Sequence, residues 1–140
     1  MLKILVLLMF FGSISFAQLR EGTEPCYGAA VKIAMNKIAK DAKTKNSVLN
    51  KIGFLADSCF YQVRNQMITC IDAKGVEQFD FEFDSSVIKN RSNTHTEMAY
   101  QFVSGTQGLN VYYVISLVRG KTANSCSYAK TTVYTEELED

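Results

Sequence analysis

Four cysteines constrain this chain more than any other feature of its sequence: Cys26, Cys59, Cys70 and Cys126. An even number of cysteines in a small exported chain usually forms a disulfide framework. No two of them have the Cys-x-x-Cys spacing of a thioredoxin-like redox site, and they are too far apart in sequence for the close ligand pairs of a structural zinc site. The sequence therefore favours two disulfides, whose pairing depends on how the segments pack.

The first 17 residues have the pattern of a secretory signal peptide. Lys3 gives a positive start, residues 4–11 form an unbroken apolar run, and Ser15 and Ala17 place small residues before a cleavage site at Gln18. A retained membrane anchor needs about 17–25 apolar residues, and this run is shorter. We therefore expect a secreted or periplasmic protein, with no stable membrane insertion after the signal peptide is cleaved.

The composition of the remaining chain, residues 18–140, predicts one folded domain. The full chain has 15 basic and 14 acidic residues, and the signal peptide holds one base, Lys3, and no acid, so the mature charges balance. A neutral chain lacks the positive field that drives non-specific binding to nucleic acid, so no nucleic-acid partner is expected. A hydrophobic content of 47% and a single proline are typical of a folded protein rather than a disordered one.

A helix is predicted first. Thr23 can cap it, and Pro25 is tolerated in its first turn. Ser47 is predicted to cap a second, short helical turn. The apolar stripe recurs at steps of three and four residues, with lysines on the opposite face; it consists of Tyr27, Val31, Ala34, Met35, Ile38 and Ala42.

Strand patterns follow the helix. Phe79, Phe81 and Phe83 alternate with polar residues, which predicts a strand with one buried face. The polar segment 85–96 is predicted to be a loop, and the segment 111–118, apolar on both faces, is predicted to be a central strand covered by the helix. The predicted strands are 59–63, 67–72, 76–84, 98–103, 111–118 and 128–134. Short connections favour an α+β fold, in which one N-terminal amphipathic helix packs on an antiparallel meander of five to six strands with two disulfides.

This topology predicts the cysteine pairs. A helix of about 20 residues matches an eight-residue strand in length, so the first strand starts at the sheet end where the helix finishes. Cys59 and Cys70 then lie together at that end, and Cys126 lies beside Cys26 at the other. A two-residue turn at Arg64-Asn65 would place Cys59 directly opposite Cys70.

Three groups of residues were weighed as candidate sites. His95, the only histidine, has Ser92, Thr94 and Thr96 as sequence neighbours, but a hydrolase needs a nucleophile and a base held together in space, so a solvated loop histidine is favoured. Asp80, Glu82 and Asp84 could attract a cation, and a solvated strand face is favoured. The tyrosines Tyr100, Tyr112, Tyr113 and Tyr128 could form a surface for a partner or could pack across strands.

The stretch Gln101-Phe102-Val103-Ser104-Gly105 resembles the Gln-x-Val-x-Gly hairpin of the cystatins, secreted cysteine-protease inhibitors in which a sheet wraps around one helix. The resemblance implies that Gln101, Val103 and Gly105 form a wedge that enters a protease cleft, with Gly22 similar to the N-terminal glycine of that family. Three predicted strands lie between the helix and this stretch, where the family has one, and the chain has no tryptophan for the family's second hairpin.

Together, these patterns predict an exported, non-catalytic binding or interaction protein. No cofactor, no catalytic residue and no metal-binding residue is expected. Its partner, a protein or a small molecule, is not specified by the sequence. The alternatives are a cystatin-like protease inhibitor that uses the Gln101–Gly105 stretch, and a small secreted hydrolase, which lacks a convincing nucleophile–base pair.

Overall fold

A computed structural model describes residues 26–54, 59–106, 108–122 and 125–138. The predicted signal peptide, residues 1–17, and the predicted helix start at residues 23–25 lie outside the described residues. So does Gly22, which the cystatin resemblance singled out. No helix within the described part of the chain has the length and apolar character needed to cross a membrane.

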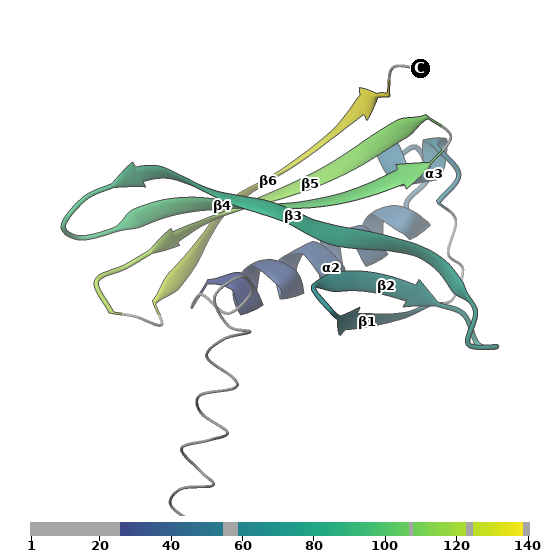
Figure 1. The fold of residues 1–140 in the computed structure, drawn as a ribbon, viewed down its shortest axis with the longest axis horizontal. Helices are drawn as coiled ribbons and strands as arrows, with labels where there is room; N and C mark the ends of the chain where they lie inside the picture. Colours follow the sequence, from purple (N-terminus) through teal and green to yellow (C-terminus); the bar gives the residue numbers. More distant parts are fainter. Residues whose placement is uncertain (1–25, 55–58, 107, 123–124, 139–140) are drawn as a thin grey trace, which may run out of the picture.

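The described chain forms one main helix, one short helix and a single six-stranded sheet (Figure 1). The sheet is an antiparallel meander in the order β1-β2-β3-β4-β5-β6, which confirms the predicted α+β class. In chain order the elements are α2 (Tyr27–Lys43), α3 (Val48–Lys51), β1 (Phe60–Arg64), β2 (Met67–Ile71), β3 (Glu77–Arg91), β4 (Thr96–Thr106), β5 (Leu109–Arg119) and β6 (Cys126–Glu137).

Helix α2 lies across one face of the twisted sheet and contacts β5, β4 and also β1, so the sheet curls around it (Figure 1). Its buried residues repeat at helical spacing and include Ala30, Ala34 and Ile38, all with no exposed surface. Lys40 and Lys43 stand in the last turn, where cations stabilise the negative end of the helix dipole. The predicted cap of α3 is confirmed, because the Ser47 hydroxyl accepts a hydrogen bond from the Asn50 amide at 3.1 Å.

A polar contact joins α2 to the sheet inside this interface. The buried Tyr113 hydroxyl on β5 donates a hydrogen bond to the Asp41 carboxylate at 2.7 Å, and Lys37 approaches the other carboxylate oxygen at 3.2 Å. Burial raises the pKa of Tyr113 far above its ordinary value of 10, and the hydrogen bond to Asp41 and the charge of that carboxylate raise it further. Asp41 is therefore buried with two partners, which offsets the cost of removing its charge from water.

Strand β3 begins as the sequence predicts and then continues further. Phe79 and Phe81 are buried and Phe83 packs at the border of the core. The prediction of a loop at residues 85–96 holds only for residues 92–95, because β3 runs to Arg91 and pairs with β4 through two irregularities, at Phe83/Ser85 and Ile88/Asn90. Strand β2 pairs with β3 only as far as Glu82, so the remainder of β3 is an exposed edge, where polar residues are tolerated.

The first hairpin turns one residue later than predicted. Asn65 and Gln66 both have positive φ, 52° and 64°, while Arg64 remains in β1 and pairs with Met67. Two successive residues of positive φ are typical of tight hairpin turns whose twist matches that of the strands, and asparagine adopts this conformation readily. Tyr61, not Cys59, therefore lies opposite Cys70, and the expectation that the two cysteines face each other directly is wrong.

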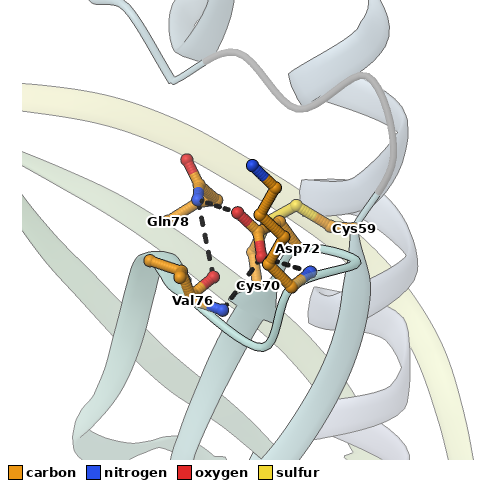
Figure 2. Close-up of a disulfide and its surroundings, with 6 residues drawn as sticks. Cys59, Cys70, Asp72, Val76 and Gln78 are labelled. Atoms are coloured by element: carbon orange, nitrogen blue, oxygen red, sulfur yellow. Dashed lines mark hydrogen bonds between the residues drawn. A yellow bond between two sulfur atoms is a disulfide. The ribbon is translucent and has the colours of Figure 1, made fainter.

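Both predicted disulfides are present: Cys59 bonds to Cys70, and Cys26 bonds to Cys126. The first crosses the hairpin diagonally, with Cα atoms 5.3 Å apart. Figure 2 shows it beside the turn after β2, where Asp72 accepts hydrogen bonds at 2.9 Å from the Lys74 and Val76 amides. The second joins the start of α2 to the start of β6, with Cα atoms 5.6 Å apart.

The predicted strand at residues 111–118 corresponds to β5, which lies next to the sheet edge rather than at its centre. Its inward side chains are nevertheless covered by α2, as expected. The largest fully buried side chains of the core are Tyr100, Tyr113, Phe81, Phe102 and Ile38. All of them lie between the helix and the sheet or within the helix face, so the core occupies the inner side of the curled sheet.

Candidate functional site

The face of the sheet opposite α2 carries a group of tyrosine and polar side chains. We define the outer tyrosine face as Gln101 and Val103 on β4, Tyr112 and Val114 on β5, and Tyr134 on β6. The strand register places them side by side, since Gln101 pairs with Val114, Val103 with Tyr112, and Tyr112 with Tyr134. Their neighbours along the strands, among them Phe102 and Tyr113, point the other way into the core.

The two tyrosines of this face are held in a fixed arrangement. Their rings stack with centroids 4.7 Å apart and planes 14° from parallel. The Tyr134 hydroxyl donates a hydrogen bond to Gln101 Oε1 at 3.1 Å, and Gln101 in turn donates to the Asp84 carboxylate through its amide nitrogen. The Tyr112 hydroxyl donates to Glu136 at 3.3 Å. Side chains from β3, β4, β5 and β6 thus form one network across the sheet.

The network makes Tyr134 a weak acid. Loss of hydration raises the pKa of its hydroxyl, and the nearby Tyr112, Glu136 and Asp84 raise it further. The hydroxyl therefore remains protonated and a hydrogen-bond donor near neutral pH. With 40% of its surface exposed, Tyr134 can still contact a partner. The outer tyrosine face offers aromatic surface, two hydroxyl groups and the Gln101 amide.

The cystatin-like interpretation of Gln101, Val103 and Gly105 is not supported by the backbone. These residues lie within β4, and each pairs with a residue of β5, whereas the hairpin end comes after Thr106. Gln101 also pairs with Ser85 and Val103 with Glu82, so both are flanked by strands on two sides. A wedge that enters a protease cleft protrudes from a hairpin tip, whereas Gln101 and Val103 lie within β4; the inhibitor role of this stretch stays a prediction.

His95 and its hydroxyl neighbours Ser92 and Thr94 lie together in the exposed turn after β3. His95 is exposed, and its Nδ1 lies 2.9 Å from the Thr94 hydroxyl. The Ser92 hydroxyl accepts hydrogen bonds from the backbone amides of Thr94 and His95, at 3.3 and 3.1 Å. Over residues 26–54, 59–106, 108–122 and 125–138, no carboxylate forms a hydrogen bond with His95 that would orient it as a base. These contacts stabilise a turn between β3 and β4.

The three acidic residues predicted from β3 lie in different surroundings, and Glu82 is exposed between Met67 of β2 and Val103 of β4. Asp84 joins the network of the outer tyrosine face, whereas Asp80 lies with Glu77, Phe79 and Ser104 around an open surface cavity of about 370 Å³. A side-chain hydrogen bond to Asp80, which the protonated Glu77 carboxyl donates, raises the pKa of Glu77, and loss of hydration and the Asp80 charge raise it further. In the described part of the chain, no three histidine, cysteine or acidic side chains come together to hold a metal ion.

The four tyrosines predicted from the sequence do not lie on one surface. Tyr100 and Tyr113 are buried in the core, Tyr112 lies on the outer face, and Tyr128 is exposed near the start of β6. The partner of Tyr112 is Tyr134, which was not among the tyrosines predicted from the sequence. The alternation of side chains along β6 indicated that Tyr134 could face outward. Its pairing with Tyr112 depends on the register between β5 and β6, which the sequence does not provide.

Comparisons of this chain with protein families, with curated proteins and with solved structures gave no match.

Proposed function

We propose that this chain is an exported, non-catalytic interaction protein that binds a protein partner through its outer tyrosine face. The observation that carries the proposal is the Tyr112–Tyr134 stack, which is fixed by hydrogen bonds on the sheet face opposite the helix. Tyrosine is enriched in protein interfaces because it supplies a large contact area and a hydroxyl at low cost in conformational entropy. Here the network has already restricted both rings before any partner binds.

The same surface favours a protein partner over a small molecule. Its side chains come from three adjacent strands and form a broad face, whereas small-molecule sites are concave and largely apolar. The cavity of about 370 Å³ near Glu77 is open and has polar residues along its rim, including Gln78 and Thr106. Among the described residues, neither Ser104 nor Thr106 at that cavity forms a hydrogen bond with Glu77 or Asp80, which supports a binding role over the hydrolase alternative.

Export is the second part of the proposal. Two disulfides are consistent with an oxidising compartment, outside the cytoplasm. The intact mass of the exported protein should correspond to a chain that starts at Gln18, and a mass that includes residues 1–17 would contradict the signal peptide.

Capture of secreted or periplasmic proteins by the immobilised mature chain tests the binding surface. The wild type should retain a partner that the Tyr112→Ala/Tyr134→Ala variant loses, because the variant removes both rings of the stack. Tyr128→Ala is the matched control, since Tyr128 is 55% exposed on the same strand as Tyr134 but pairs with the buried Leu117. Equal capture by all three proteins, with circular dichroism showing intact folds, would contradict the proposed surface.

A further inference from the structure

We propose that two copies of this chain pair through the free edges of their β6 strands, so that two six-stranded sheets join into one. The sheet order ends at β6, whose far side has no neighbouring strand among the described residues. Its pairing with β5 is regular from Leu109 opposite Glu137 to Ser116 opposite Lys130. This leaves a long row of unpaired backbone groups, in regular register over most of its length, that can bond to another strand.

The other exposed edges of the sheet are protected in ways that β6 is not. Strand β1 has only 5 residues, and the free part of β3 is interrupted by two irregularities, at Phe83/Ser85 and Ile88/Asn90. Short edges and bulges are the usual means of preventing strands from pairing between molecules. Strand β6 has 12 residues, and the one irregularity in its pairing with β5, between Ser116 and Leu117, lies toward its start.

The sequence of β6 is complementary to itself when it runs antiparallel to a second copy. With the two-fold axis at Val133, Lys130 of one copy lies opposite Glu136 of the other, and the same pair occurs again by symmetry. Thr131 then lies opposite Thr135, and Thr132 opposite Tyr134. Opposite charges, paired threonines and a β-branched residue facing its own copy are all favourable cross-strand pairs.

This register also places outer-face residues of one copy opposite outer-face residues of the other. Lys130, Thr132 and Tyr134 pair with Ser116, Val114 and Tyr112 of β5, so they belong to the outer face. Val133 pairs with Tyr113 and packs against the core, so it belongs to the inner face. Because each residue meets one of the same face, the outer faces of both copies lie on one side of the joined sheet.

The pairing adds little buried surface beyond the strands themselves, so we expect a reversible dimer with a Kd in about the micromolar range. Sedimentation of the mature protein, residues 18–140 with both disulfides formed, should show a monomer–dimer equilibrium. Lys130→Glu should weaken it by about tenfold or more, because two ion pairs become two repulsive contacts. The exchange Lys130→Glu/Glu136→Lys should restore the dimer.

Lys89→Glu is the matched control, since Lys89 is an exposed lysine on the irregular edge of β3, and this variant should dimerise as the wild type does. In a second experiment, Val133→Cys should form a covalent dimer on oxidation, because residues directly opposite in an antiparallel pair have Cα atoms about 4.5–5.5 Å apart, within disulfide range. A monomer at about 100 µM protein, far above the expected Kd, or a dimer that Lys130→Glu leaves unchanged, would overturn the proposal.

Discussion

At the scale of single residues, the contact between Tyr113 and Asp41 is the point where the helix and the sheet depend on each other. The hydroxyl is buried, and so is the carboxylate that accepts its hydrogen bond. A hydrogen bond to a charged group contributes more to stability than a neutral one, and removal of one partner leaves the other buried without it. This contact therefore stabilises the docked helix and also determines how the fold responds to alkaline pH.

Tyr113→Phe should lower the free energy of unfolding by about 1–3 kcal/mol, because Asp41 would retain only Lys37 as a partner. The raised pKa of Tyr113 gives the sign of the pH effect. Below about pH 10 the tyrosine is protonated in both states; above it the unfolded chain loses the proton and the native chain keeps it, so stability falls.

Urea unfolding between pH 8 and 12 measures this prediction. Burial also raises the pKa of Tyr27 and Tyr61, so Tyr113→Phe should reduce the alkaline loss of stability without abolishing it. Identical pH profiles for the variant and the wild type would show that Tyr113 titrates normally. Tyr128→Phe, at an exposed position, is the control and should leave the profile unchanged.

At the scale of elements, local patterns predicted β3 correctly where its side chains alternate and failed beyond Phe83, where its pairing with β4 becomes irregular. Phe79 and Phe81 follow strict alternation, and their faces were predicted correctly. Ser85 and Asn90 have low strand preference, yet they lie in β3 because β4 pairs with them across two bulges. A bulge breaks the period of two on which the sequence interpretation depends, so the long β3–β4 hairpin could not be found from alternation alone.

The candidate site was missed for a related reason. Tyr112 and Tyr113 are adjacent, so one had to face the core and the other the outside, but the sequence does not state which. The disulfide pairs could be predicted because they depend only on which end of the sheet each cysteine reaches, and a turn displaced by one residue does not change that. Topology was therefore easier to predict than register.

The turn of the first hairpin offers a test at this scale. Gln66 adopts φ of 64°, which costs an ordinary residue about 1 kcal/mol, and its carbonyl accepts a hydrogen bond from the Phe83 amide. Gln66→Gly should keep that backbone hydrogen bond and raise the free energy of unfolding by about 0.5–1 kcal/mol, measured by urea unfolding. Gln66→Ala, which retains a Cβ atom, should give no such gain; equal gains from both would contradict the turn geometry.

At the scale of the whole molecule, the two disulfides close loops of very different length. Cys26–Cys126 spans a sequence separation of 100 residues and joins the first described element to the last, whereas Cys59–Cys70 spans 11 within one hairpin. In the chain-entropy description, the longer loop gives about 5 kcal/mol and the shorter about 3 kcal/mol.

Replacing Cys26 and Cys126 by serine should therefore destabilise the protein by about 2 kcal/mol more than replacing Cys59 and Cys70 by serine. Cys26 and Cys70 are both fully buried, so each double variant places one hydroxyl in the core and the comparison is matched. Urea unfolding of the two variants gives the difference. The reverse order of stability would show that the Cys59–Cys70 bond in the hairpin stabilises the protein more than the bond that closes the long loop.

The bond between Cys26 and Cys126 also determines how this molecule would carry mechanical tension. A force applied to the two chain ends passes from Cys26 directly to Cys126 and then along β6, and it bypasses everything between the two cysteines. Strand β6 is already extended, at about 3.3 Å per residue, so tension can lengthen it very little. In a single-molecule pulling experiment on the oxidised protein, the segment between the two cysteines should add no length, and reduction should release about 350 Å of additional chain.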